Sequence, residues 1–388
     1  MIDHSVLTIR DLCTEFTTDD GVMRVLDGVS FHVPRGKTLG IVGESGCGKS
    51  VTAMSIMGLL PKPFGQVVAG SIIYSDQKDD SQSELDLLQL PAEKMYRMRG
   101  NRISMIFQDP MTALNPVHTI GKQLMEVLEL HRPELKKKQR YSAALEMLEK
   151  VGIPSPKQRM LEFPHLLSGG MRQRVMIAMA LACRPDVLIC DEPTTALDVT
   201  VQAQILDLMR ELQAETGMSI IFITHDLGVV AEMCDQVVVM YAGKVVEQAD
   251  IFELFDHPSH PYTQGLLASM PSMIGAPKSL LPTIEGSVPA LNQMPCGCRF
   301  VTRCQYAQDL CHQKPPDLQL VILNQSVISK RSVISKQSTV LKQSSEFTPS
   351  ETPKQTTASQ PTCAKVPDSH LVSCHYWERL TPLKNGAI

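Results

Sequence analysis

The chain has 388 residues, 43% of them hydrophobic and 20% charged, which suits a globular protein with two domains or one domain and a large extension. Its net charge of −4 gives no basic excess that would favour a nucleic-acid partner. No apolar run approaches the roughly 18 residues of a membrane span, and residues 1–4 show no secretory signal. We therefore expect a cytosolic protein that reaches a membrane only by docking onto other subunits.

The first 120 residues carry strand patterns and one short helix pattern. Asp20-Gly21 is a turn signal between two alternating segments and predicts a hairpin. A buried strand then runs into a glycine-rich loop, and 51–60 reads as a helix that stops before Pro61. The polar, acidic stretch 76–86 is expected to be a surface loop. The predicted strands of this part are 6–10, 29–33 and 38–42.

Residues 120–182 are mostly helical in pattern, and strands and helices alternate after them. The segment 201–215 is a predicted helix between two buried strands. Strands that alternate with helices favour a three-layer α/β core. The predicted strands of this part are 187–190, 220–223 and 237–240.

After about residue 250 the composition changes, with more proline and glycine and a group of cysteines. Residues 326–343 contain a short imperfect repeat, and Ser, Thr, Gln and Pro dominate to about 361. This composition predicts a disordered, low-complexity insertion at about 322–361.

The segment from Gly43 to Ser50 fits the pattern glycine, four residues, Gly-Lys-Ser. Glycines let backbone N–H groups wrap phosphates, Lys49 is expected to reach the β and γ phosphates, and Ser50 to ligate magnesium. The alternative is a chance glycine-rich turn, but the buried strand before it and the helix after it favour the phosphate loop. The expected contacts are Gly43, Glu44, Ser45, Gly46, Cys47, Gly48, Lys49, Ser50 and Val51.

A second motif is the apolar strand 187–190, which ends in Asp191 and Glu192. Asp191 is expected to hold magnesium through water, and Glu192 to polarise the attacking water as a general base. A strand that ends in two acids is common, and it gains meaning here because it accompanies the phosphate loop.

A third motif is Ser168-Gly169-Gly170, in which Ser168 is a predicted helix N-cap and the glycines expose helix N–H groups. It predicts a second anion site, 119 residues after Lys49. The alternative is an ordinary capped helix.

Taken in order, these segments resemble the nucleotide-binding domains of ATP-binding-cassette transporters, most closely those of oligopeptide and dipeptide importers. The resemblance implies an α/β P-loop NTPase cassette with an antiparallel β subdomain and a helical subdomain, followed by a loop-rich, cysteine-containing C-terminal extension. The expected cassette is 1–255, with its helical subdomain at about 110–180. The expected extension is 256–388, with the insertion at about 322–361.

The resemblance also implies residue roles. The Ser-Gly-Gly segment, with Gln173, would complete the ATP site of a partner across a head-to-tail dimer. Gln108 would sense magnesium, His225 would contact the γ-phosphate, and Asp198 in Ala196-Leu197-Asp198 would couple the two sites. Phe16 would stack on adenine. The implied catalytic set is Glu192, His225 and Gln108.

Each of these residues has a plainer interpretation when it is read alone. Gln108 could be a surface residue at a strand end, His225 a satisfied histidine and Phe16 a packing residue. The His-Pro pairs at His257 and His260 resemble the segment that ends the cassette in these importers, although alone they could suggest metal ligands. The ordered combination of segments favours the functional roles.

The cysteines of the C-terminal part form the last motif. Cys298, Cys304 and Cys311 are 6 and 7 residues apart, and Cys374 follows 63 residues later. Four thiolates can hold an iron–sulfur cluster or zinc, and this spacing does not choose between them. The region is similar to the C-terminal region of the peptide importers, some of which carry a 4Fe-4S cluster there. That similarity implies the same cluster on these four cysteines. Cys296 and Cys363 are alternative ligands, and unliganded thiols are the plain alternative.

The resulting expectation is an ATP- and magnesium-dependent ATPase subunit of a peptide importer, at the cytoplasmic face of the cell (inner) membrane. Its implied partners are a second cassette subunit in a heterodimer, two transmembrane permease subunits and an external substrate-binding protein, with no nucleic acid. The alternatives are import of nickel or another small solute, a cassette ATPase outside transport, and a non-catalytic nucleotide-gated module. The intact Glu192 argues against the last of these.

Overall fold

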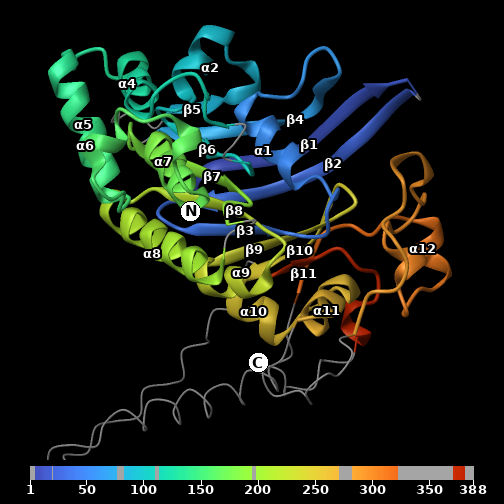
Figure 1. Ribbon diagram of the computed structural model, residues 1–388. Coiled ribbons are helices and arrows are strands. Elements are labelled where there is room, and N and C mark those ends of the chain that lie inside the picture. Colours follow the sequence, from blue (N-terminus) through green and yellow to red (C-terminus); the bar gives the residue numbers. More distant parts are fainter. Residues whose placement is uncertain are drawn as a thin grey trace, which may run out of the picture.

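The computed structural model describes residues 5–19, 21–76, 83–109, 113–194, 198–270, 282–321 and 370–380. Two sheets occupy its centre, a group of helices lies at one end, and the C-terminal extension lies at the other (Figure 1). The predicted insertion at 322–361 and Cys363 fall outside the described residues.

The smaller sheet is antiparallel, with the strand order β2-β1-β4-β5. Thr18 pairs with Gly21, so the predicted hairpin is confirmed, although Asp20 lies outside the described residues. The surface loop expected at 76–86 is wrong at both ends, because residue 76 belongs to β4 and residues 83–86 pair with that strand. The Asp86 side chain also accepts the Ile72 N–H at 3.2 Å. The strands are β1 (Ser5–Thr18), β2 (Gly21–Pro34), β4 (Gly65–Asp76) and β5 (Ser83–Asp86).

Among the described residues, the larger sheet has eight strands in the order β11-β12-β10-β9-β3-β8-β7-β6. The five from β9 to β6 are parallel, and β10, β12 and β11 extend them in antiparallel pairing. The strands are β3 (Thr38–Val42), β6 (Ile103–Ile106), β7 (Val187–Asp191), β8 (Ser219–Ile223), β9 (Gln236–Tyr241), β10 (Lys244–Asp250), β11 (Gln319–Leu320) and β12 (Leu371–Val372).

Strand periodicity divides the core into two. Successive side chains of a strand point to opposite faces, so Leu188 and Cys190 pack against helices, whereas Val187 and Ile189 pack against α1 and the small sheet. All four are fully buried. The result is the three-layer α/β core that the alternation of strands and helices predicted.

The helices largely follow the predicted pattern. The first, α1, spans Lys49–Met57, two residues earlier than expected, and ends at Gly58 in the left-handed conformation. Four helices within 120–181 form the helical part at one end of the molecule. The helices are α1, α2 (Ala92–Met98), α4 (Ile120–His131), α5 (Lys137–Lys150), α6 (Pro156–Arg159), α7 (Gly169–Leu181), α8 (Val199–Thr216), α9 (Leu227–Met233), α10 (Ile251–Asp256), α11 (Pro261–Ala268) and α12 (Asp309–Gln313). Within the described ranges, none of these helices has the length and apolar character to cross a membrane.

The extension is fastened to the larger sheet by a buried carboxylate. Glu247 of β10 is fully buried, and it accepts the backbone N–H groups of Ser259 and His260 at 2.6 and 2.9 Å. Its third partner is His370 Nε2, at 2.8 Å, in the segment that leads into β12. Segments more than a hundred residues apart therefore meet on one side chain. The rings of Tyr241, Tyr262 and Phe300 pack against one another and join the same sheet to the extension.

Candidate active site

The predicted catalytic residues follow four neighbouring strands of the larger sheet. The glycine-rich loop follows β3, His225 follows β8, Asp191 and Glu192 stand at the end of β7, and Gln108 follows β6. Because the carboxyl ends of parallel strands lie at one edge of a sheet, the fold brings these segments together.

The glycine-rich loop is wound around the Lys49 ammonium group. Gly43, Gly46 and Gly48 have φ of 150°, 80° and 104°, and a Cβ at Gly43 would lie 2.2 Å from the Met240 carbonyl oxygen. Lys49 is 6% exposed, and its Nζ donates to the carbonyl oxygens of Gly43 at 2.7 Å and Glu44 at 3.1 Å. Its Nζ also lies 3.9 Å from the Cys47 Sγ, and a buried cation with neutral partners such as these is suited to binding an anion.

Ser50 and Asp191 lie at the other side of this loop. The Ser50 Oγ donates to the Asp191 Oδ1 at 3.1 Å. Burial raises the pKa of Asp191, and the hydrogen bond from Ser50 and the charge of Lys49 partly oppose that effect. A hydroxyl and a carboxylate offer the hard oxygen atoms that Mg²⁺ prefers, so these two residues fit the ion. Bound there, magnesium would offset the negative charge of the phosphates.

Glu192 is held between the two other predicted catalytic residues. Gln108 Nε2 donates to its Oε2 at 3.2 Å, and His225 Nδ1 lies 3.2 Å from its Oε1. Glu192 also has a φ of 48°, a left-handed conformation that costs a non-glycine residue about 1–3 kcal/mol. The structure thus brings the three predicted catalytic residues together. A strained residue whose two carboxylate oxygens both have fixed partners is suited to a catalytic role.

The second predicted anion site is an open helix end. Ser168 caps α7 and accepts the Met171 N–H at 3.3 Å, and a Cβ at Gly169 would meet nothing within 4 Å. Gln173 is 2% exposed, and its amide donates to the Pro193 carbonyl oxygen, while its expected contact with a nucleotide stays a prediction. Gln173 therefore connects α7 to the segment after Glu192.

The remaining predicted contacts lie in ordinary structural positions. Asp198 caps α8 by accepting the Val201 N–H at 2.9 Å, and its hydrogen bond from Thr200 lowers its pKa. Residues 195–197, which include Ala196 and Leu197, lie outside the described residues. Phe16 is half-buried in β1 and packs against Gly65 of β4. Its predicted stacking on adenine, like the role of Asp198, stays a prediction.

The comparisons with known proteins agree with this geometry. Residues 26–195 match the family model "ABC transporter", and residues 246–311 match "Oligopeptide/dipeptide transporter, C-terminal region". The "Probable peptide ABC transporter ATP-binding protein y4tR" of Sinorhizobium fredii is 52% identical over 81% of this chain and 91% of that protein. The chain belongs to the ATP-binding-cassette ATPases of the oligopeptide/dipeptide transporter family.

A second curated relative and a solved structure also match this chain. The "Dipeptide transport ATP-binding protein DppD" of Bacillus subtilis is 50% identical over 81% of this chain and 90% of that protein. A solved bacterial cassette, the dimeric MJ0796, matches with a TM-score of 0.54 at 25% identity, over 63% of this chain and 98% of its own. The predicted cassette fold is confirmed.

Two residues of this cassette ATPase were missing from the sequence-based site. The Tyr262 hydroxyl accepts the Glu44 N–H at 2.8 Å, and the Arg303 guanidinium pairs with the Glu44 carboxylate. They lie 218 and 259 residues from Glu44, so no periodic pattern joins them to the loop. The only sequence signals were the segment that ends the cassette and a basic residue beside Cys304.

The predicted metal-binding cysteines line one pocket. Cys298, Cys304, Cys311 and Cys374 all contribute to it, together with His260, Phe300 and other residues of the extension. Within the described part of the chain, however, no three His, Cys, Asp or Glu side chains are grouped closely enough to hold a metal ion. The thiols therefore surround a common space without forming a ready-made ligand group.

Burial acts on the pKa of three of these thiols. It raises the pKa of Cys298 to about 11 and that of Cys374 to about 12, and it also raises the pKa of Cys304. Backbone N–H groups oppose this effect: Phe300 donates toward Cys298, Tyr306 toward Cys304 and Tyr376 toward Cys374. In each case the donor lies two residues after the cysteine. Of the two alternative ligands, Cys296 is exposed and Cys363 lies outside the described residues.

Proposed function

We propose that this chain is the ATP-hydrolysing subunit that powers the import of dipeptides or oligopeptides through a membrane transporter. The observation that carries this proposal is the Glu192 carboxylate, held by Gln108 and His225 at the same sheet edge as the phosphate loop. The peptide substrate is supported by the family and by relatives named for peptide and dipeptide transport.

The geometry supports transfer of the γ-phosphoryl group of ATP to water. Such a reaction needs charge stabilisation and an oriented nucleophile more than covalent chemistry. Lys49 and the N-terminal N–H groups of α1 would receive the phosphates, and Glu192 would accept the proton of the attacking water. Gln108 and His225 hold both oxygens of that carboxylate, so its orientation is set before the nucleotide binds.

The functional unit would be a head-to-tail dimer of cassettes. Ser168 and Gly169 are exposed at the start of a 13-residue helix, so they are available to the nucleotide of another subunit. The solved cassette that matches this chain is described as dimeric. We favour a heterodimer with a related ATPase subunit, in which each Ser-Gly-Gly segment closes the phosphate loop of the other chain.

The other expected partners follow from the same family membership. They are two transmembrane permease subunits and an external substrate-binding protein, which would place this subunit at the cytoplasmic face of the inner membrane. The proposed domains are a cassette at 1–255, with a helical subdomain at about 110–180, and an extension at 256–388. The matches to the two family models, at 26–195 and 246–311, support a cassette followed by a distinct C-terminal region.

The cysteine pocket is a candidate site for a 4Fe-4S cluster. Its support is the convergence of four cysteines on one pocket. A cluster would hold the loops of the extension together. Protein purified without oxygen should absorb at about 400 nm and contain iron, and Cys304→Ser should lose both. Colourless protein with one equivalent of zinc would contradict the cluster.

Peptide uptake tests the transport function directly. A strain that lacks this chain should take up labelled dipeptide again when it carries the wild-type chain, and not when it carries Glu192→Gln. Glu211→Gln, on the exposed face of α8, is the matched control and should restore uptake. Restoration of nickel uptake without peptide uptake would replace the peptide by a small solute, and restoration of neither would contradict a transport function.

A further inference from the structure

An ion pair joins the C-terminal extension to the phosphate-binding loop. Arg303 donates from one terminal nitrogen to the Glu44 Oε2 at 2.9 Å and from the other to the Oε1 at 3.1 Å. The Arg303 side chain is 5% exposed and that of Glu44 is 30% exposed. A two-point contact of this kind fixes the direction of the carboxylate as well as its charge.

Arg303 is itself held rigidly by the extension. Its Nε donates to the Glu285 carbonyl oxygen at 3.0 Å, and a terminal nitrogen donates to the Ile284 carbonyl oxygen at 3.2 Å. The guanidinium carbon lies 5.8 Å from the centre of the Tyr241 ring and 5.9 Å from that of Phe300. These contacts fix the position of the guanidinium independently of its ion pair with Glu44.

Glu44 is held at three points, one of which is Lys49 of the phosphate-binding loop. Its carboxylate is bound by Arg303, its N–H donates to the Tyr262 hydroxyl at 2.8 Å, and its carbonyl oxygen accepts from Lys49 Nζ at 3.1 Å. Tyr262 also belongs to the region after the expected cassette boundary. Two residues of the extension thus act on the loop residue that contacts Lys49.

The ion pair between Arg303 and Glu44 also changes the charge of the phosphate-binding loop. A carboxylate in the phosphate-binding loop would repel the phosphates of ATP if it were free, and Arg303 offsets that charge. We propose that Arg303 is a positioning residue of the ATP site, which neutralises Glu44 and fixes the phosphate loop, so that nucleotide affinity depends on the folded extension. This inference rests on the proposed ATPase function.

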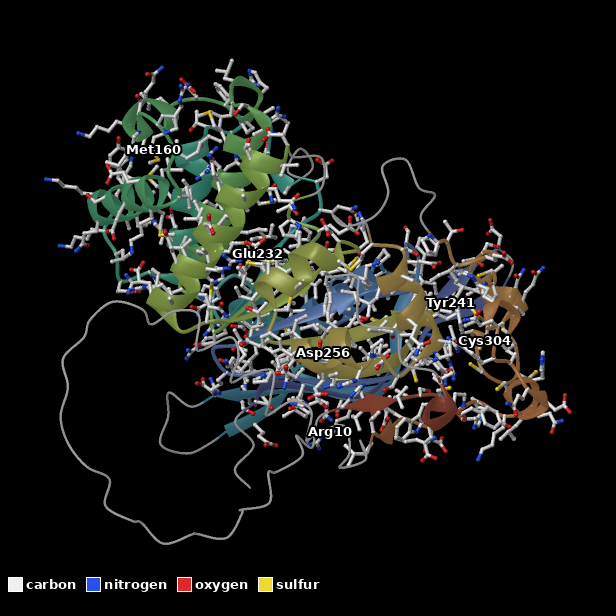
Figure 2. The ribbon with its side chains drawn as sticks, turned by 90° about the horizontal axis from the view of Figure 1, so that it is seen from below. Arg10, Met160, Glu232, Tyr241, Asp256 and Cys304 are labelled. Carbon is white, nitrogen blue, oxygen red and sulfur yellow. The ribbon has the colours of Figure 1, made fainter. Side chains whose placement is uncertain are left out.

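The same contact relates the cysteine pocket to the ATP site. Phe300, Val301 and Cys304 line the pocket, and Arg303 lies in the same turn. Figure 2 shows Cys304 in the extension, beside the part of the sheet that carries Tyr241 and away from Met160 of the helical part. A change in the folding of this turn would move Arg303 and weaken its ion pair with Glu44.

The test is the affinity for a non-hydrolysable ATP analogue, measured by titration calorimetry on the full chain. Arg303→Gln should bind the analogue about tenfold more weakly, because an unpaired carboxylate then faces the phosphates. Arg303→Lys, which keeps the charge without the two-point contact, should lie between this variant and the wild type. The loss should shrink as salt is added.

The double variant Glu44→Gln/Arg303→Gln separates this role from a general loss of folding. It should recover most of the affinity, since the charge that Arg303 offsets has been removed. Arg299→Gln is the matched control: Arg299 lies in the same segment and pairs with Asp27 of β2 at 2.7 Å, so its loss should leave the affinity unchanged.

Two results would overturn the proposal: wild-type affinity in folded Arg303→Gln, or a double variant that binds as weakly as Arg303→Gln alone. If Arg303→Gln fails to fold, the affinities of Arg303→Lys and of the double variant decide the question. If the wild-type chain itself bound no analogue, the ATPase function would fail rather than the role of Arg303.

Discussion

The catalytic edge of the sheet and the C-terminal extension are built in different ways. At the edge, each chemical residue follows the end of a parallel strand, so the order of strands alone brings the residues together. In its described residues the extension has short helices and two-residue strands, and buried side chains such as Glu247 and Arg303 hold it in place. The edge is therefore robust to local change, whereas the extension depends on a few polar contacts.

The largest expected effect on stability comes from breaking the attachment of the extension at Glu247. Glu247→Ala would leave the N–H groups of Ser259 and His260 and the His370 ring without their acceptor, at a cost of about 3 kcal/mol in the free energy of unfolding. Urea unfolding measures this loss. Glu211→Ala, on an exposed helix face, should change the free energy by less than about 0.5 kcal/mol. Equal stability of the two variants would show that Glu247 does not anchor the extension.

The next effect breaks the catalytic edge and leaves the fold in place. Lys49→Met removes the charge to which the loop carbonyls of Gly43 and Glu44 are bonded, so ATP should bind about 100-fold more weakly. Titration with ATP measures this. Lys37→Met is the control, because Lys37 lies at the other end of β3 and pairs with Asp235 on the surface. Loss of affinity in the control as well would point to damage of the strand.

The smallest effect concerns the link between the two regions. Tyr262→Phe keeps the ring packing but removes the hydroxyl that accepts the Glu44 N–H, and it should weaken ATP binding about fivefold. Tyr141→Phe, on exposed α5, should bind as the wild type does. An unchanged affinity in Tyr262→Phe would leave Arg303 as the only effective contact between the extension and the loop.

Much of the catalytic edge could be predicted from the sequence because its signals are local. The glycine pattern before Lys49, the two acids after β7 and the residues after β6 and β8 each stand in a short segment next to a buried strand. Gln173 shows the limit of such reasoning. Its nucleotide contact, implied by the family resemblance, stays a prediction, but no local pattern signalled its burial or its hydrogen bond to the Pro193 carbonyl oxygen.

The extension could be predicted only in part. The chemistry of the four cysteines predicted a common site, and the fold brings them to one pocket. Cys374 reaches it although residues 322–369 separate it from the other three in the sequence. Arg303 and Tyr262 could not be assigned to the phosphate loop, because their contacts with Glu44 depend on how distant segments pack. The strand at 83–86 was missed for a similar reason, since its pairing with β4 outweighs its polar composition.

The most direct test of the central claim is turnover and ATP binding in purified Glu192→Gln. The variant keeps the shape of the side chain but removes the proton acceptor that Gln108 and His225 hold. We expect ATP to bind as in the wild type and hydrolysis to slow about thousandfold. Hydrolysis at nearly the wild-type rate, with ATP still bound, would show that Glu192 is not the general base.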